Sequence, residues 1–268
     1  MLGERKHKLA WTGIVSQKLH FIAAQQPEAQ TAYDECVKRY GQNDLQEADV
    51  IIALGGDGMM LQTVKELLNS GKPIYGMNKG TIGFLMNEYA LEELPERVEQ
   101  AVSTRIYPLS MTAIDVDGKQ SQALALNEVS MLRQSYQASK LRISIDGKVR
   151  LQELICDGVL VATPQGSTAY NFSAHGPIIP IRAPLLALTP LIPFRPRRWN
   201  GALLPNQSKV KIEVLEQDKR PVNAVADQTE IKSVVEVNIH EDQSRHGIIM
   251  FDSSHSWEDR ILEEQFRQ

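Results

Sequence analysis

The chain has 268 residues, a formal net charge of −4 and two cysteines, and this length suits one long domain or two moderate ones with separate cores. The mildly negative charge, without long Lys/Arg blocks, argues against nucleic acid as the main partner, and no stretch reaches the ~20 apolar residues of a membrane span. Cys36 and Cys156 show neither metal-ligand spacing nor a disulfide framework, and residues 1–8 do not begin a signal peptide, so we expect a cytoplasmic protein without a membrane partner.

Residues 1–104 alternate between strand-like and helix-like segments, which is typical of βαβ units around a parallel sheet. The apolar, β-branched run at 50–54 predicts a strand buried on both faces. Apolar side chains at helical spacing then predict a helix that stops before Gly71 and Pro73. In chain order we expect a strand at 9–15, a helix at 27–40, a strand at 50–54, a helix at 59–70, a strand at 74–77 and a helix at 91–103.

From residue 105 the pattern changes to β-hairpins, because Asp117-Gly118 and Asp146-Gly147 each separate two strand-like runs. The expected strands cover 111–116, 123–132, 141–145, 210–214 and 235–239. Near the end of the chain, apolar residues at helical spacing predict a helix that packs back on the first domain: Trp257, Ile261, Leu262 and Phe266. The expected fold is a Rossmann-like parallel α/β domain at 1–104, completed by 252–268, and a β-rich, sandwich-like domain at 105–251.

The motif Gly55-Gly56-Asp57-Gly58 lies directly after the predicted strand at 50–54 and opens a helix. In open α/β sheets ligands bind at this carboxyl edge, and glycines there let main-chain amides approach a phosphate. Asp57 is the unusual member, because a carboxylate repels phosphate; it is a candidate base or ligand of a metal-bound water. A role in capping the helix explains the same residue.

A second glycine loop, 76–84, follows the next predicted strand and contains Lys79. Its glycines and single lysine suit a phosphate or pyrophosphate, although an ordinary βα connection has the same composition.

Asn127-Glu128 interrupts an apolar strand, and buried polar groups are costly unless they have partners. Amide and carboxylate groups suit sugar hydroxyls and the edge of a purine; the alternative is a solvated strand end.

The densest motif is Thr163-Pro164-Gln165-Gly166-Ser167-Thr168-Ala169-Tyr170, preceded by Asp157-Gly158. A strand leads into a turn and a helix start that Ser167 or Thr168 can cap, and Tyr170 can stack on a base.

In this order and spacing, these motifs resemble the signature of the NAD kinases, the ATP-NAD phosphotransferases, and the loop ending Gly83-Phe84-Leu85 matches as well. The resemblance covers residues 11–251. The GGDG motif is shared with phosphofructokinases and lipid kinases, so the specificity lies in the Asn-Glu pair and the TPxGSTAY block.

The resemblance implies transfer of the γ-phosphate of ATP to the 2′-hydroxyl of the adenosine ribose of NAD, with Asp57 accepting the proton. The implied substrate-binding residues are Gly58, Phe84, Asn127, Glu128, Asp157, Thr168, Ala169, Tyr170, Asn171, Phe172, Ser173 and Gln228, and Gly55, Gly56, Lys79 and Gly80 form the phosphate-donor loop. It also implies NAD and ATP as partners, Mg²⁺ that arrives with ATP rather than on a protein metal cluster, and a homo-oligomer, either a dimer or a tetramer.

Three features depart from the family pattern. His175 stands where many relatives have a small residue and suits either a ligand contact or a structural hydrogen bond. Asp227-Gln228 lacks the glycine often found between these residues. The basic loop with Arg195, Arg197 and Arg198 suits ATP phosphates, a neighbouring subunit or solvent.

Two other functions use the same motifs. A lipid or sugar kinase would keep GGDG but does not need the Thr-Ala-Tyr segment, and a lipid kinase should also show an apolar or basic membrane face. A sensor of NAD(P) without catalysis gains nothing from a carboxylate beside a phosphate, so Asp57 argues against it. Polyphosphate as donor, NADH as acceptor and feedback by NADP stay open.

Overall fold

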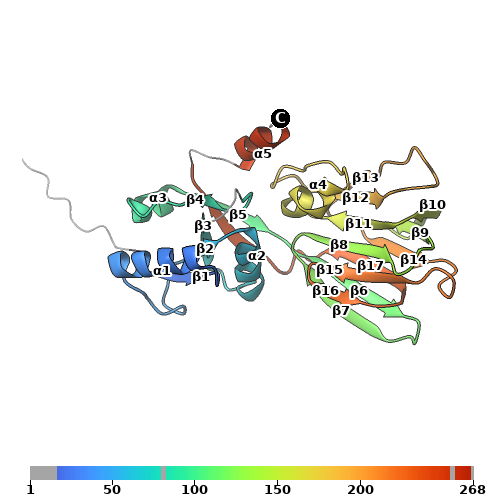
Figure 1. The fold of residues 1–268 in the computed structure, drawn as a ribbon, viewed down its shortest axis with the longest axis horizontal. Coiled ribbons are helices and arrows are strands. Elements are labelled where there is room, and N and C mark those ends of the chain that lie inside the picture. Colours follow the sequence, from blue (N-terminus) through green and yellow to red (C-terminus); the bar gives the residue numbers. More distant parts are fainter. Residues whose placement is uncertain (1–16, 80–82, 254–256, 267–268) are drawn as a thin grey trace, which may run out of the picture.

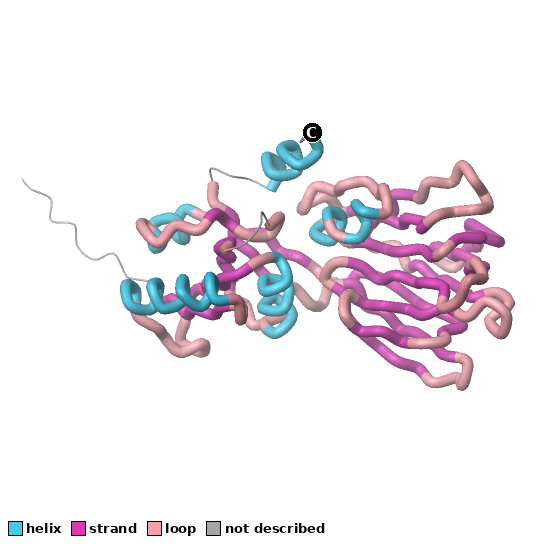
Figure 2. The backbone as a smooth tube through the Cα atoms, in the orientation of Figure 1, coloured by secondary structure: helices cyan, strands magenta, loops and turns pink. Residues whose placement is uncertain are grey.

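The computed structural model describes residues 17–79, 83–253 and 257–266. Two domains lie side by side along the long axis of the molecule (Figure 1). Helices surround the sheet of the first domain, whereas the second domain consists almost entirely of strands (Figure 2). The expected combination of an α/β domain and an all-β domain is therefore confirmed. Within the described ranges, no helix has both the length and the apolar character needed to cross a membrane.

The α/β domain is built on one six-stranded sheet, with the order β1-β2-β3-β18-β5 and the short β4 beside β3. All neighbours pair in parallel except β5, which runs antiparallel to β18. The strands are β1 (Leu19–Ala23), β2 (Val50–Gly55), β3 (Pro73–Asn78), β4 (Asn87–Glu88), β5 (Val102–Ile106) and β18 (Gly247–Phe251), and the helices are α1 (Pro27–Tyr40), α2 (Asp57–Glu66), α3 (Leu94–Gln100) and α5 (Trp257–Phe266).

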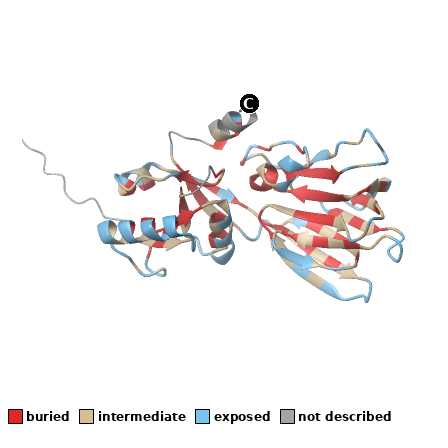
Figure 3. Ribbon diagram, viewed as in Figure 1, coloured by how far each residue is buried: buried red, intermediate tan, exposed pale blue. Residues whose placement is uncertain are grey.

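Strand β2 is buried on both faces, as its apolar run predicts (Figure 3). Ile51 and Ala53 pack in the cluster that contains Met60 of α2, while Ile52 packs with Cys36 of α1 on the other side. Strand β2 leads directly into α2, so the Gly-Gly-Asp-Gly turn between them lies at the carboxyl edge of the sheet. In Figure 1, α2 lies on the side of the α/β domain that faces the second domain.

Several expected boundaries differ from the structure. The strand expected at 9–15 lies outside the described residues, and β1 was not predicted. Helix α2 ends at Glu66 rather than at residue 70, because Asn69 takes a left-handed conformation (φ 60°) and its side chain bonds to the main chain of Ser244 and His246. The helix expected at 91–103 was wrong beyond Gln100, since the following residues form β5 and pair with β18.

The β domain consists of two antiparallel six-stranded sheets, with the orders β10-β9-β14-β17-β6-β7 and β13-β12-β11-β8-β15-β16. The run expected as one strand at 123–132 breaks at Asn127, because its two halves join different sheets. The elements are β6 (Leu109–Asp115), β7 (Gln120–Ala125), β8 (Glu128–Arg133), β9 (Ser139–Ile145), β10 (Lys148–Cys156), β11 (Gly158–Ala162), the 3₁₀ turn Gln165–Thr168, α4 (Tyr170–Ser173), β12 (Leu185–Leu191), β13 (Ala202–Pro205), β14 (Val210–Val214), β15 (Val222–Ala226), β16 (Thr229–Ile231) and β17 (Val234–Glu241).

Helix α5 packs on the α/β domain, as expected. Trp257 is 2% exposed and Ile261 is buried, both in the cluster that also contains Ile51 and Ile249. Strand β18 belongs to the α/β sheet as well, whereas the division expected from the sequence assigned residues 105–251 to the second domain.

Candidate functional site

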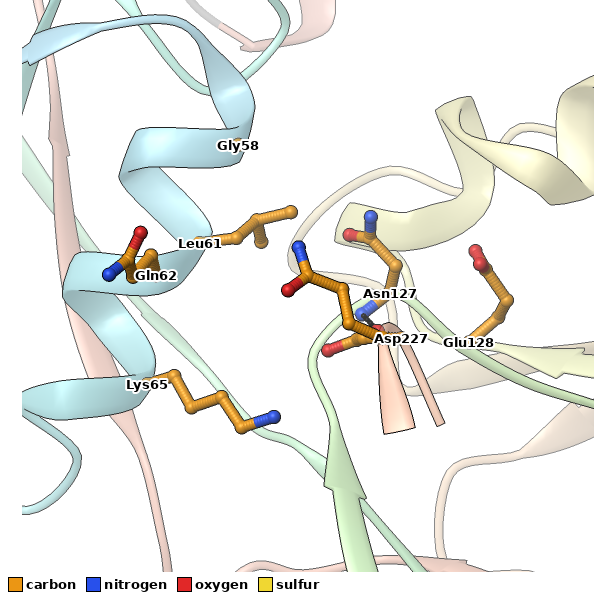
Figure 4. A pocket seen from close by; sticks show the side chains of 8 residues that line it. Gly58, Leu61, Gln62, Lys65, Asn127, Glu128 and Asp227 are labelled. Carbon is orange, nitrogen blue, oxygen red and sulfur yellow. Dashed lines mark hydrogen bonds between the residues drawn. The ribbon is translucent and has the colours of Figure 1, made fainter. Parts of the chain in front are cut away.

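A pocket of about 190 Å³ lies between helix α2 and the β domain. We call it the interdomain pocket; it is lined by Gly58, Leu61, Gln62 and Lys65 on one side and by Asn127, Glu128, Asp227 and Gln228 on the other. The α2 residues follow the spacing i, i+3, i+4, i+7, which places them on one helix face. In Figure 4, Leu61 and Lys65 extend from this face toward the β domain, with Asn127 opposite.

The corner at Asn127 is fixed by main-chain hydrogen bonds to distant residues. The Asp227 carboxylate accepts the N–H groups of Leu126 and Asn127 at 2.7 and 3.0 Å. On the other side, the Thr163 N–H donates to the Asn127 carbonyl at 2.9 Å. Gly166 packs so closely that an added Cβ would lie 2.1 Å from the Asn127 carbonyl oxygen. The backbone of Asn127 is therefore satisfied within the fold.

Glu128 carries a buried oxygen, Oε2, that has no hydrogen-bond partner among the described residues. Burial and the charge of Asp227 raise the pKa of Glu128 to about 7, against the opposing effect of the Tyr170 main-chain N–H. An uncompensated buried carboxyl oxygen beside a pocket is suited to accept a hydrogen bond from a ligand hydroxyl.

Asp57 is the first residue of α2, and its carboxylate is held by the second glycine loop. Oδ2 accepts the Phe84 N–H and Oδ1 accepts the Leu85 N–H, both at 2.9 Å. No side chain of the described residues caps α2 by a hydrogen bond, so the capping role considered from the sequence is not what the structure has. Burial raises the pKa of Asp57, whereas the two amides and the charge of Arg260 lower it.

Asp57 directly precedes Gly58, which forms part of the wall of the interdomain pocket, but Asp57 does not itself line this pocket. Gly83 is needed for this arrangement, since a Cβ there would lie 2.5 Å from Oδ1 of Asp57. Each carboxylate oxygen accepts one main-chain bond and keeps lone-pair capacity for a further donor.

The two glycine loops meet through their main chains, because the Lys79 N–H donates to the Gly55 carbonyl at 3.0 Å. Gly55 has φ 156°, and a Cβ there would lie 3.0 Å from the Cβ atoms of both Ala24 and Met59. The Lys79 ammonium lies 3.5 Å from the centroid of the Tyr89 ring. Gly80 lies outside the described residues.

A second cavity of about 630 Å³, the Asp157 cavity, lies in the β domain. Arg133 Nε donates to Asp157 Oδ1 at 2.6 Å on its wall. Tyr170, Ser173 and His175 also line it, and His175 has a left-handed backbone with φ 59°. Tyr170 lines this cavity, and its main-chain N–H lowers the pKa of Glu128 in the interdomain pocket, so Tyr170 lies between the two pockets.

The remaining residues that were expected to contact the substrate differ in how far they are buried. Thr168 and Ala169 are partly buried beside Tyr170, and Phe172 is exposed. Asn171 is fully buried: its amide donates to the Ser167 and Pro177 carbonyls, and its Oδ1 accepts the Thr189 hydroxyl at 2.6 Å. Asn171 therefore fixes the turn from inside. Phe84 places its ring against Trp257, with centroids 6.2 Å apart.

Other residues lie at the pockets without having been predicted. Gln62, Lys65 and Arg133 were missed, although helical spacing from Gly58 identifies the first two. In the basic loop, the guanidinium groups of Arg195 and Arg197 lie over the Phe194 ring. Over the described part of the chain, no group of three or more His, Cys, Asp or Glu side chains is placed to hold a metal ion.

Comparison with known proteins identifies the family of this chain. Residues 10–106 match the family model of the ATP-NAD kinase N-terminal domain, and residues 126–255 match that of the ATP-NAD kinase C-terminal domain. The chain belongs to the ATP-NAD kinase family. The resemblance to the NAD kinases that the sequence motifs indicated is confirmed.

Similar proteins cover nearly the whole chain. The NAD kinase of Brucella suis is 58% identical over 252 residues, which are 94% of this chain and 98% of that protein. The NAD kinase of Rhizobium meliloti is 58% identical over 248 residues, 92% of this chain and 96% of that protein.

Two solved structures share the fold. Yeast NADH kinase, solved with NADH, has a TM-score of 0.79 at 22% identity and covers 94% of this chain and 88% of its own. An NAD kinase from Archaeoglobus fulgidus, solved with ATP, has a TM-score of 0.73 at 25% identity and covers 93% of this chain and 98% of its own.

Proposed function

We propose that this protein is an NAD kinase that transfers the γ-phosphate of ATP to the 2′-hydroxyl of the adenosine ribose of NAD, forming NADP. The NAD kinases that share 58% of its residues over nearly its full length support this activity. The Archaeoglobus fulgidus NAD kinase solved with ATP supports ATP as the donor. Mg²⁺ enters as part of the MgATP substrate.

Asp57 is the proposed proton acceptor. Phosphoryl transfer needs alignment, charge neutralisation and a group that takes the proton of the attacking hydroxyl. Burial raises the pKa of Asp57, which makes its carboxylate a stronger base. The Phe84 and Leu85 amides orient the carboxylate and leave lone pairs for the ribose hydroxyl. The position of Asp57 directly before Gly58, which lines the interdomain pocket, together with the bonds from Phe84 and Leu85, is the observation that carries the proposal.

The proposed contacts follow the two pockets. Asn127 and Glu128 hold the ribose hydroxyls and the adenine edge, with Gln228 beside them in the interdomain pocket. Thr168, Ala169 and Tyr170 enclose the adenine, and Asp157 and Ser173 serve the nicotinamide side in the Asp157 cavity. Gly55, Gly56 and Lys79 form the proposed phosphate-donor loop together with Gly80, which lies outside the described residues, and Lys65 adds positive charge to the interdomain pocket. Asn171 supports this wall from the interior.

We further propose that the functional domains are 17–106 with 247–266, and 107–246, on the basis of sheet membership. A cytoplasmic homo-oligomer, dimer or tetramer, is the proposed form of the enzyme. Exposed apolar side chains on the β domain, among them Ile192, Phe194 and Leu203, support subunit contact there. Light scattering of the purified protein tests the oligomer, and a monomeric mass contradicts it.

The activity is tested by incubating the protein with ATP, Mg²⁺ and NAD and following the product with an NADP-specific dehydrogenase. We expect NADP to accumulate only when all three are present. A protein that forms no NADP but phosphorylates a sugar or lipid hydroxyl would contradict the proposal. Parallel reactions with polyphosphate or NADH establish the range of donors and acceptors.

A further inference from the structure

Arg260, on the C-terminal helix α5, contacts the same short segment that holds Asp57. Its Nη1 donates to the Phe84 carbonyl at 3.3 Å and to the Met86 carbonyl, and its Nη2 donates to Asn87 Oδ1 at 3.1 Å. The amides of Phe84 and of its neighbour Leu85 donate to the Asp57 carboxylate. One guanidinium group and one carboxylate thus hold residues 84–87 between them.

The end of this segment is anchored in the sheet through Asn87. Its buried Nδ2 donates to the carbonyls of Gly76 and Met250, each at 3.0 Å. Its Oδ1 accepts the Asp252 N–H at 3.0 Å in addition to the Arg260 donor. Asn87 fixes one end of the segment, and Arg260 adds the link from the carbonyls of Phe84 and Met86 to α5.

Helix α5 has apolar anchors that do not depend on Arg260. The Trp257 ring lies between Phe84 and Phe251, with centroid distances of 6.2 and 6.1 Å. Ile261 is buried in the same cluster. Burial of these large apolar side chains favours the docked helix, so α5 should stay docked when the Arg260 hydrogen bonds are removed.

The charge of Arg260 also acts on Asp57. It lowers the pKa of the Asp57 carboxyl, opposing the larger effect of burial, which raises it. Because the proton acceptor must be ionised before it can act, a neighbouring positive charge extends the working range of the base to lower pH. The partners of Arg260 named above, Phe84, Met86 and Asn87, line neither the interdomain pocket nor the Asp157 cavity.

We infer that Arg260 is a positioning residue for phosphoryl transfer: it fixes residues 84–87, a segment in which the amides of Phe84 and Leu85 orient the Asp57 carboxylate. The inference rests on the role proposed for Asp57. It makes the C-terminal helix part of the catalytic machinery, although none of the α5 side chains that the structure describes lines the interdomain pocket or the Asp157 cavity.

Steady-state kinetics of Arg260→Gln provide the first test. We expect kcat to fall roughly 10- to 100-fold, because a small displacement of a reacting group has an effect of this size, while KM for NAD changes by less than about twofold. The acid limb of the kcat–pH profile should move to higher pH, since Asp57 loses a stabilising charge. Wild-type kcat with an unchanged acid limb would overturn the inference.

Two further variants separate charge and geometry from folding. Arg260→Lys keeps the charge but not the planar fork, so we expect a reduced kcat with the acid limb in its wild-type position; a shifted limb contradicts the charge effect. If Arg260→Gln does not fold, the kcat and the acid limb of Arg260→Lys test the inference in its place. Arg39→Gln is the matched control, because Arg39 forms one exposed ion pair with Glu92 at 3.4 Å, and its kcat should be unchanged.

A double-mutant cycle tests whether Arg260 acts through Asp57. In an Asp57→Asn background, Arg260→Gln should lower the residual kcat by less than about twofold. An equal loss in both backgrounds would show that Arg260 acts elsewhere and would overturn the inference. Failure of the proposed function is distinguishable, because the wild-type protein would then form no NADP at all.

Discussion

Asp227 holds Asn127 in place across 100 residues of sequence, because one of its carboxylate oxygens accepts the Asn127 N–H at 3.0 Å. The other oxygen accepts the neighbouring Leu126 N–H at 2.7 Å. Hydrogen bonds to an ionised acceptor are about twice as strong as neutral ones, so this corner is fixed before a ligand arrives. The late Asp-Gln pair of the sequence thus combines a positioning carboxylate with Gln228, which lines the interdomain pocket.

Asp227→Asn should loosen this corner. An asparagine side chain offers one acceptor and one amide donor in place of two acceptors, so one main-chain N–H loses its partner. We expect the free energy of unfolding to fall by about 1–3 kcal/mol and KM for NAD to rise about 10-fold. Chemical denaturation and steady-state kinetics measure the two effects. Asp218→Asn, at an exposed turn, is the control, and an unchanged KM in Asp227→Asn contradicts the role.

Glu128 should make stability depend on pH. Its folded-state pKa of about 7 lies above the ordinary value of 4.5, so the folded protein holds this proton more tightly than the unfolded chain. The stability that this more tightly held proton contributes is fully present below pH 4.5 and is lost as the pH rises through about 7. We expect Glu128→Gln to exceed the wild type by about 1–2 kcal/mol in free energy of unfolding at about pH 8, and to match it near pH 4. Urea denaturation at both pH values measures this, and a difference independent of pH contradicts it.

Gly166→Ala should damage the fold at the site. The added Cβ would lie 2.1 Å from the carbonyl oxygen and 2.4 Å from the Cα of Asn127, and this backbone is held on both sides. We expect a loss of roughly 1–3 kcal/mol or more in thermal or chemical denaturation, together with weaker NAD binding. Gly58→Ala is the contrast, since no neighbouring atom of the described residues lies within 4 Å of its added Cβ. It should keep its stability, and an equally large loss in both variants would be evidence against the close-approach argument.

Lys65→Ala should weaken the binding of the anionic substrates. Lys65 lines the interdomain pocket from an exposed position on α2, and its charge is suited to the phosphates. We expect KM for ATP to rise roughly 3- to 10-fold, more at low than at high ionic strength, with stability unchanged. Lys38→Ala, an exposed lysine in the last turn of α1, is the matched control. A rise in KM that does not depend on salt contradicts an electrostatic role.

The sequence predicted those parts of the fold that local patterns determine. The apolar run of β2 and the helical spacing of α2 placed Asp57 at the carboxyl edge of a parallel sheet, where the structure has it. The Asp-Gly turns at 117–118 and 146–147 likewise lie between paired strands. In each case the decisive interactions are between residues close together in the chain.

The features that were not predicted depend on contacts between distant residues. Residues 102–106 form a strand because β18, more than 140 residues later, pairs with them. The bonds from Phe84 and Leu85 to Asp57 likewise arise only when separate loops are brought together. The same holds for the burial of the Glu128 oxygen that has no partner in the described part of the chain. Asn171 belongs to a motif that resembles a ligand-binding wall, yet its side chain is fully engaged inside the fold.

The proton acceptor is the central claim, and Asp57→Asn tests it most directly when kcat and the Kd for NAD are measured on the same preparation. Asparagine removes the base and one of the two main-chain acceptors, so a modest drop in Tm is expected as well. The account predicts that NAD binding stays within a few-fold of the wild type while kcat falls roughly 10²–10⁴-fold. A loss of NAD affinity as large as the loss of rate, or a kcat near that of the wild type, would contradict it.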